Sequence, residues 1–308
     1  MSFSYIAAGI SIINDIEYHD GSKKDSRLGG CAIFAYSGIG LFTDSVLFLS
    51  SGGPDFFDHY GDYFKENQIC DEGISISLPH THHTLLKYEA DGTWHEDSIY
   101  GPDYFALQSE NNRTSFKKLK PFLSKETKGL YIDSNAFEKI FDEIDEIRKL
   151  APNMKIMWEP PTMSSKDPSL HDLVLNNLHK VDYYSMNLDE ASSFFSCESR
   201  DEIISEIMKL NIPCFLREGE NGSSWIEDHN IVFLPSIDPE EAIDVTGCGN
   251  CSTAAALYWK IEGKDERDIV VNANIAAKLN SMADGAFGVK KARDERAYLS
   301  MRRSYEGL

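Results

Sequence analysis

Positive charge is scarce in this 308-residue sequence, and long apolar runs are absent from it. The chain carries 30 Lys and Arg residues against 50 Asp and Glu residues, for a net charge of −20. Such a charge repels nucleic acid and anionic membrane surfaces, so neither is expected as a partner. No stretch reaches the about 18 uninterrupted apolar residues of a membrane span, so no membrane segment is expected.

Neither a secretion signal nor a disulfide framework is expected from this sequence. The start, MSFSYIAAGISIIND, lacks the basic residues and the small-residue cleavage site of a signal peptide, and it is typical of a first buried strand. Six cysteines are scattered through the chain, at Cys31, Cys70, Cys197, Cys214, Cys248 and Cys251. This pattern is not a disulfide framework, so we expect free thiols and a cytoplasmic protein.

What the sequence does contain is an alternation of short apolar runs with longer amphipathic ones. The segment 44–53 reads as a strand, the segments 171–187 and 199–218 each read as a helix followed by a strand, and the segment 266–288 reads as a helix ending at Gly285. Alternating strands and helices predict an α/β fold, with a parallel sheet covered by helices on both faces. We expect one domain over residues 1–308.

Two polar segments interrupt this succession of strands and helices, at residues 16–30 and 84–101. Polar and apolar residues partly alternate within them. The second contains Asp91-Gly92, a strong hairpin signal. We interpret these segments as the strands of a small β-lid, at about 16–28 and 84–100. Ordinary surface hairpins are the alternative interpretation.

The stretch DVTGCGNCSTAAALYW, residues 244–259, places Gly247, Cys248 and Gly249 before an apolar helical run. A turn of small residues at a helix N-terminus directs several unpaired N–H groups at one spot, which suits phosphate or the charge of a transferring phosphoryl group. A tight connection without a ligand is the alternative.

Two further pairs of residues suit a ligand site. Asn187 and Glu190 are spaced i, i+3, so an amide and a carboxylate could hold Mg²⁺ through water, or could simply cap a helix. Asn14 and Asp15 follow an apolar strand, where α/β folds bind ligands. Gly29 and Gly30 precede a small apolar helix, where they either admit a ligand to the backbone or form a turn.

Together, in this order, these features resemble the ribokinase/PfkB family of sugar and nucleoside kinases. The family motif D-T-x-G-A-G-D stands here as residues 244–250, its N-x-x-E as residues 187–190, and its early glycine pair as residues 29–30. The segment LREGENGSSWI resembles the family's nucleotide-side turn, and ANIAAKLNSMADGAFG its late helix and turn over adenine. The resemblance implies a ribokinase-like, doubly wound, three-layer fold with a β-lid.

The resemblance also implies Mg²⁺-dependent phosphoryl transfer from ATP to a hydroxyl of a sugar, nucleoside or related small molecule. It assigns substrate contacts to Asn14, Asp15, Gly29 and Gly30, and it assigns the anion hole to Gly247, Cys248 and Gly249. Nucleotide contacts are assigned to Asn187, Arg217, Gly219, Gly222 and Asn274. Magnesium is assigned to Asn187 and Glu190, and a monovalent cation such as K⁺ to Asp244 and Thr246. It further implies a homodimer formed through the lid.

One position departs from the family at the point where chemistry needs a base. Asn250 stands where the family's aspartate takes the proton from the attacking hydroxyl, and losing a positioned base costs about 10²- to 10⁴-fold in rate. Either another carboxylate, Asp15 or Asp244, acts as base, or the acceptor is already ionised, or the chain is a weakly catalytic ligand sensor. A hydrolase that uses Asn14 and Asp15 on a ribosyl bond is a further alternative.

Glu159, in MWEPPTMS, is the second departure from the family. It stands at the end of the central strand, where its carboxylate could reach substrate or metal or could cap the strand end.

Three other sets of residues have both a chemical and a structural interpretation. Cys248 and Cys251 form a C-x-x-C that could be a redox pair, although two small residues around the turn explain the same spacing. The histidines of LPHTHHTLL could bind metal or substrate, or could be incidental loop residues; they are His80, His82 and His83. Trp94 and Tyr100 could pack on a ring-shaped substrate or stabilise the hairpin.

Overall fold

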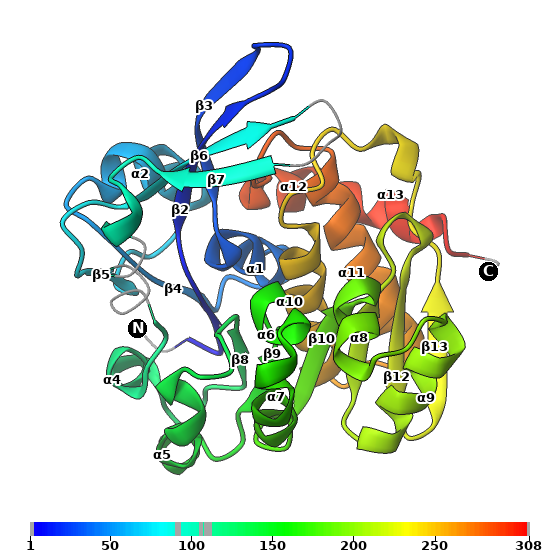
Figure 1. Ribbon diagram of the computed structural model, residues 1–308. Helices are drawn as coiled ribbons and strands as arrows, with labels where there is room; N and C mark the ends of the chain where they lie inside the picture. The colour runs from blue at the N-terminus through cyan, green and yellow to red at the C-terminus, as the bar shows by residue number, and fades with distance from the viewer. Residues whose placement is uncertain (1–2, 90–93, 105–106, 108–112, 307–308) are drawn as a thin grey trace.

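The computed structural model describes residues 3–89, 94–104, 107 and 113–306 of the chain (Figure 1). Among these residues, nine strands form one sheet in the order β13-β12-β11-β10-β9-β8-β1-β4-β5. Its strands are β1 (Tyr5–Ala8), β4 (Val46–Gly52), β5 (Ile74–Ile76), β8 (Gly129–Ile132), β9 (Lys155–Trp158), β10 (Tyr183–Asn187), β11 (Cys214–Arg217), β12 (Ser223–Glu227) and β13 (Asn230–Leu234). All pairs are parallel except β11–β12 and β12–β13 at one edge.

Side chains of the central strands alternate between two hydrophobic cores, one on each face of the sheet. In β1, Tyr5 and Ala7 join one cluster, whereas Ile6 and Ala8 join the other. Because successive residues of a strand point to opposite faces, a strand buried on both sides must be apolar throughout. The short apolar runs of the sequence are therefore central strands, and the predicted three-layer α/β fold is confirmed.

Helices cover both faces. The first core is closed by α1 (Cys31–Gly40), α2 (Phe56–Asn67), α10 (Cys248–Ile261), α11 (Glu266–Ser281), α12 (Val289–Glu295) and α13 (Ala297–Arg303). The other face carries α4 (Phe116–Leu119), α5 (Ile144–Leu150), α6 (Thr162–Lys166), α7 (His171–Leu178), α8 (Leu188–Phe195) and α9 (Arg200–Leu210). Single 3₁₀ turns lie at Lys120–Phe122, Lys139–Asp142, Pro168–Leu170, Gly219–Asn221 and Pro239–Glu241. Helix α11 ends at Ser281, before the predicted Gly285.

Helices α1 and α10 pack unusually closely in the middle of the molecule. A Cβ at Gly38 of α1 would lie 2.1 Å from the carbonyl oxygen of Cys251 in α10. All ten residues of α1 are buried. This contact holds the first turn of α10 against the end of α1, and the glycine motif of residues 247–249 lies at that first turn.

A second sheet stands above the main one (Figure 1). Its strand order is β3-β2-β6-β7, with β2 (Ile12–Glu17), β3 (Lys23–Gly29), β6 (His82–Tyr88) and β7 (Trp94–Ser98). The predicted lid strands are thus present as a small sheet. The predicted hairpin turn at Asp91-Gly92 lies outside the described residues.

The predicted first strand is wrong in one respect, because the structure divides it into two. The chain leaves β1 after Ala8 and enters the second sheet at Ile12. The apolar composition hides this break because Ile13 of β2 is fully buried in the first core.

No helix in the described part of the chain is long and apolar enough to span a bilayer. All six cysteines are free thiols, as the scattered spacing predicted.

Candidate active site

Helix α10 begins at the predicted glycine turn. Gly247 precedes the helix with a φ of 74°, a left-handed conformation that favours glycine. A Cβ at this position would also lie 2.1 Å from the ring of Phe34 in α1. The turn is therefore fixed both by its backbone conformation and by the close packing of α1 against it.

The first backbone amides of α10 differ in what they bind. The N–H of Cys248 donates to the carbonyl of Val245 at 3.2 Å. For the N–H groups of Gly249 and Asn250, the described residues supply no acceptor. An anion at this helix N-terminus would therefore be held by the amides of Gly249 and Asn250 rather than by the amide of Cys248.

A cavity of about 420 Å³ lies against this turn. Seven of the residues predicted for the anion hole and the nucleotide line it: Asn187, Arg217, Gly219, Gly222, Cys248, Gly249 and Asn274. The structure thus brings these predicted residues together, although they come from four separate segments of the chain.

The far wall of the cavity is built by a glycine turn and by α11. Gly219 and Gly222 have positive φ values of 61° and 132°, and a Cβ at Gly222 would lie 2.1 Å from the carbonyl oxygen of Leu234. The Asn274 amide accepts from the Ser223 hydroxyl at 2.6 Å and donates to the Leu234 carbonyl at 3.2 Å. The side chain of Asn274 therefore joins α11 to the neighbouring segments at Ser223 and Leu234 through its hydrogen bonds.

Asn187 and Glu190 form a reciprocal helix cap at the start of α8. The Asn187 side chain accepts from the Glu190 N–H, and Glu190 Oε2 accepts from the Asn187 N–H, both at 2.8 Å. Glu190 Oε1 accepts from the Thr162 hydroxyl at 2.9 Å. The capping interpretation of this pair is confirmed, and both oxygens of the carboxylate are bound by the protein.

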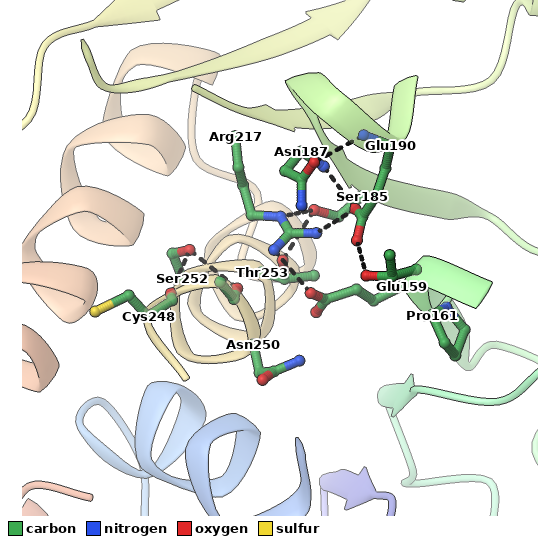
Figure 2. A network of polar contacts seen from close by, with 12 residues as sticks. Glu159, Pro161, Ser185, Asn187, Glu190, Arg217, Cys248, Asn250, Ser252 and Thr253 are labelled. Atoms are coloured by element: carbon green, nitrogen blue, oxygen red, sulfur yellow. Dashed lines mark hydrogen bonds and ion pairs between the residues drawn. The ribbon is translucent and has the colours of Figure 1, made fainter. Parts of the chain in front are cut away.

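Arg217, the last residue of β11, lies between two carboxylates (Figure 2). Its Nη1 is 2.9 Å from Glu159 Oε1, its Nη2 is 3.2 Å from Glu190 Oε2, and its Nε donates to the Ser185 hydroxyl at 3.0 Å. Burial disfavours the charged guanidinium, but the two carboxylates outweigh it and raise the pKa of Arg217. Arg217 is thus a permanent cation within the site.

Asn250 is tied to the same network through Tyr131 of β8. The Asn250 amide nitrogen donates to the Tyr131 hydroxyl at 3.0 Å, and that hydroxyl donates to Glu159 Oε2 at 2.8 Å. Burial and the charge of Glu159 raise the pKa of Tyr131 well above its usual range, so the phenol keeps its proton. This direction of donation leaves the Asn250 amide oxygen as the atom that can accept from a substrate hydroxyl.

Asp133 is an acidic residue close to Glu159 that no sequence motif marked. Ile132, the last residue of β8, pairs with the ends of β1 and β9, so Asp133 lies beside Gly9 and Glu159 at the carboxyl edge of the sheet. Burial, followed by the charge of Glu159, raises the pKa of Asp133 to about 7. The sequence does hold one signal for Asp133, because this residue directly follows the apolar run GLYI, which forms a buried strand.

The predicted substrate residues Asn14, Gly29 and Gly30 lie together where β2 and β3 meet α1. Asn14 Oδ1 accepts from the Thr84 hydroxyl at 2.8 Å, and a Cβ at Gly29 would lie 2.5 Å from Asn14 Nδ2. Gly30 has a φ of 87°, and a Cβ there would lie 2.4 Å from the Ile10 carbonyl oxygen. These glycines are required by close contacts within the protein itself.

Asp15 lies in the second sheet, in β2, and not at the end of a main-sheet strand as predicted. Its Oδ1 accepts from the Ser26 N–H at 2.8 Å, and its Oδ2 lies 2.9 Å from His83 Nε2. Burial opposes ionisation, but these partners prevail and lower the pKa of Asp15. A carboxylate with a lowered pKa is a weaker base.

Asp244 and Thr246, predicted to hold a monovalent cation, form a local turn that is bound to the end of α11. Asp244 Oδ1 accepts from the Thr246 N–H at 2.9 Å. The Thr246 carbonyl accepts from Asn280 Nδ2 at 2.7 Å, and the Asp244 N–H donates to the Ser281 carbonyl at 3.0 Å.

Comparison with known proteins identifies the family. A family model described as pfkB family carbohydrate kinase matches residues 17–286. The chain belongs to this family. It is 30% identical to ribokinase from Bacillus subtilis over 155 residues, which is half of this chain and half of that enzyme. It is 22% identical over 321 residues to an uncharacterized protein of Schizosaccharomyces pombe, covering 89% of this chain and 83% of that protein.

Solved structures of nucleoside and sugar kinases share the fold. Nucleoside kinase from Burkholderia thailandensis, in complex with inosine, superposes with a TM-score of 0.73 at 15% identity over 98% of both chains. A putative ribokinase II from E. coli superposes with a TM-score of 0.74 at 16% identity, over 99% of this chain and 100% of that one. The ribokinase-like fold, with its large mostly parallel sheet and small second sheet, is confirmed.

Membership of the PfkB family implies the use of ATP and Mg²⁺. The Asn187–Glu190 pair does not fit a directly bound metal ion, because both Glu190 oxygens are engaged and a guanidinium lies 3.2 Å from one of them. Throughout the described ranges, no group of three or more His, Cys, Asp or Glu residues could hold a metal ion.

The redox alternative for this PfkB chain finds no support in its thiols. Burial raises the pKa of Cys248 and raises that of Cys251 well above its usual range, whereas a reactive thiol needs a lowered pKa.

The histidine loop has mainly structural partners. The His80 ring stacks on Tyr100 with centroids 4.6 Å apart, which supports the interpretation of Tyr100 as a structural residue. His82 is buried, and burial lowers its pKa to about 4. Trp94 begins β7, and the role predicted for its ring stays a prediction.

Proposed function

We propose that this chain transfers the terminal phosphoryl group of ATP to a hydroxyl of a sugar, nucleoside or related small molecule. The observation that carries the proposal is the cavity beside α10. Its wall combines the unpaired N–H of Gly249 at a helix N-terminus with the guanidinium of Arg217, within a protein of net charge −20. Such a local concentration of donors suits a polyphosphate.

Two neighbours support this range of acceptors. The Burkholderia thailandensis nucleoside kinase was solved with inosine, and also with ADP-inosine. A fructokinase from Vibrio cholerae was solved with fructose, ADP and calcium ion. For this chain, the acceptor would lie between the Asn14–Gly29–Gly30 group and the glycine turn, with the amide oxygen of Asn250 accepting a hydrogen bond from its hydroxyl.

Asp133 is the best candidate for the base that Asn250 cannot be. Asp15 is bound by the Ser26 N–H and by His83, and its pKa is lowered, whereas Asp244 is engaged in a local turn. Asp133, with a pKa of about 7, is matched to proton transfer near neutral pH. In the proposed step the acceptor oxygen forms a bond to the γ-phosphorus, the bond to the β,γ-bridging oxygen breaks, ADP leaves, and the hydroxyl proton passes to Asp133.

A coupled ADP-release assay over a panel of sugars and nucleosides tests the proposal. Wild type and Asn250→Asp are assayed side by side, because the aspartate variant restores the family residue and reports an acceptor even if the wild type is slow. An acceptor-dependent rate in either form supports phosphoryl transfer. Binding of nucleotide by both forms, without turnover of any acceptor, contradicts it.

The second candidate is a sensor that binds the same ligands with little turnover, and Asn250 is the observation that favours it. Calorimetry with the same panel separates the two, since a sensor binds sugar or nucleoside tightly and forms no product over hours. A ribosyl hydrolase would instead release free base from a nucleoside without ATP.

A monovalent cation at the Asp244–Thr246 turn and a homodimer through the second sheet also belong to the proposal. Replacing K⁺ by a bulky organic cation in the assay tests the first. Light scattering of the purified chain tests the second, because a homodimer doubles the mass expected from 34.7 kDa.

A further inference from the structure

The positive charge of Arg217 lies next to the helix N-terminus at which the phosphate groups of a nucleotide would bind. A Cβ built on Gly249 would lie 2.1 Å from Arg217 Nη1 and 3.6 Å from Glu159 Oε1. The guanidinium therefore lies directly over the first turn of α10, beside the amide that faces the cavity. Figure 2 shows it between the start of α10 and the Asn187–Glu190 cap.

The guanidinium has more N–H donors than its contacts within the protein use. An arginine carries five N–H groups, and three contacts are made to Ser185, Glu159 and Glu190. The side chain is 14% exposed, and the residue lines the 420 Å³ cavity. The exposed part of the guanidinium thus faces the same space as the helix N-terminus, where a polyphosphate would lie.

Arg217 compensates the negative charges of the Glu159 and Glu190 carboxylates. The side chains of Glu159 and Glu190 are 7% and 6% exposed. Two carboxylates this deeply buried need a cation next to them. Arg217 supplies that cation, through its ion pairs at 2.9 and 3.2 Å.

We propose that Arg217 is a built-in cation that takes the place of a protein-bound Mg²⁺ at the phosphate end of the nucleotide cavity. This inference rests on the proposed function, since it presumes that the cavity binds a nucleoside di- or triphosphate. Its guanidinium holds Glu159 and Glu190 and donates to the phosphate oxygens of the nucleotide. The chain therefore binds nucleotide in the absence of divalent metal, and removal of Arg217 converts the site into one that requires the metal.

Calorimetric titration with ADP, once with Mg²⁺ in excess over the nucleotide and once with EDTA, tests this directly. For wild type we expect the two dissociation constants to agree within about threefold. For Arg217→Gln we expect weak or undetectable binding in EDTA and recovery by about tenfold or more with Mg²⁺. Thermal unfolding of the variant without nucleotide should shift upward on addition of Mn²⁺, because loss of the guanidinium frees Glu159 Oε1 to bind the metal.

Arg200→Gln is the matched control. Arg200 makes a comparable bidentate pair with Glu218, at 2.6 and 2.8 Å, and Glu218 is 4% exposed on its side chain. This variant also takes the cation from a buried carboxylate, which keeps its hydrogen bond from the Ser224 hydroxyl and lies next to the turn at Gly219–Gly222 rather than the turn at Gly247–Gly249. It should lose stability without any change in the effect of EDTA on ADP binding.

The outcomes separate the inference from the function on which it rests. EDTA-sensitive binding by wild type, by more than about tenfold, overturns the inference and leaves the proposed function standing. Equal binding by Arg217→Gln and wild type under both conditions overturns it as well. Failure of wild type to bind ADP under any condition overturns the proposed function and the inference together. If Arg217→Gln does not fold, the inference is tested by ADP binding to wild type with Mg²⁺ and with EDTA. Arg217→Lys provides a second test, because it keeps the charge and its ADP binding should remain insensitive to EDTA.

Discussion

The guanidinium of Arg217 fills the space that a side chain at Gly249 would need. The distance from Nη1 to a Cβ at that position would be 2.1 Å, far inside van der Waals contact. A residue at the end of β11 and a residue in the first turn of α10 therefore constrain one another. Glycine at position 249 is explained by this contact, in addition to the approach of a phosphate that the family motif implies.

Gly249→Ala should therefore weaken nucleotide binding by displacing Arg217. We expect ADP affinity to fall by about tenfold or more, and the free energy of unfolding to fall by about 1–3 kcal/mol from overpacking. Calorimetry and urea unfolding measure the two effects. Gly61→Ala is the control, because its Cβ would lie 3.8 Å from the nearest atom; it should leave binding unchanged. Unaltered ADP affinity in Gly249→Ala would contradict the assigned position of the guanidinium.

The proton acceptor can be assigned by a pair of substitutions. Asp133→Asn should lower kcat by about 10²- to 10⁴-fold while ADP affinity stays unchanged, because only proton transfer is lost. Adding Asn250→Asp to that variant should restore turnover, since a carboxylate then stands at the family position. Asp15→Asn and Asp244→Asn serve as controls and should keep most activity. Full activity of Asp133→Asn would remove Asp133 from the mechanism.

The raised pKa of Asp133 also predicts how stability depends on pH. Its folded-state value of about 7 lies above the ordinary 3.8, so the folded protein binds the extra proton between these pH values. The contribution of Asp133 to stability is therefore complete below about pH 4 and is lost as the pH rises through about 7.

Asp133→Asn should remove this dependence. Between pH 5 and pH 8 the variant should gain roughly 2–4 kcal/mol relative to wild type, measured by urea unfolding at both values. Asp142→Asn is the control, because that side chain is 83% exposed and should show no such change. A constant difference between Asp133→Asn and wild type across this range would show that the folded-state pKa is ordinary.

Tyr131→Phe tests the link between Asn250 and Glu159. The substitution removes the hydroxyl that accepts from the Asn250 amide and donates to Glu159, so we expect a loss of about 1–3 kcal/mol in unfolding free energy. The KM of the acceptor should rise, because the amide is no longer oriented, while ADP affinity is retained. Tyr184→Phe, equally buried in the other core, should leave KM unchanged. An unchanged KM in Tyr131→Phe would show that the link is structural only.

Much of the fold could be predicted from the sequence because it depends on local patterns. Residues 46–52 form a strand buried along its whole length, and apolar residues spaced for a helical face mark α9. The glycine turn at 247–249 could be located for the same reason, since a positive φ before an apolar helix requires glycine. The division between β1 and β2 could not be predicted, because Ile13 is as buried in its second-sheet strand as Ile6 is in β1.

By itself, the sequence determined the alternation of strands and helices, the ordered family motifs, and the position at which the family's base is missing. Only the tertiary structure decided what surrounds that position. Tyr131 and Arg217 lie in β8 and β11, and Asp133 directly follows β8. Parallel strands bring their carboxyl ends to one edge of the sheet however far apart they lie in sequence. Charge neutralisation and pKa shifts depend on distance and burial in space, and neither can be read from the order of residues along the chain.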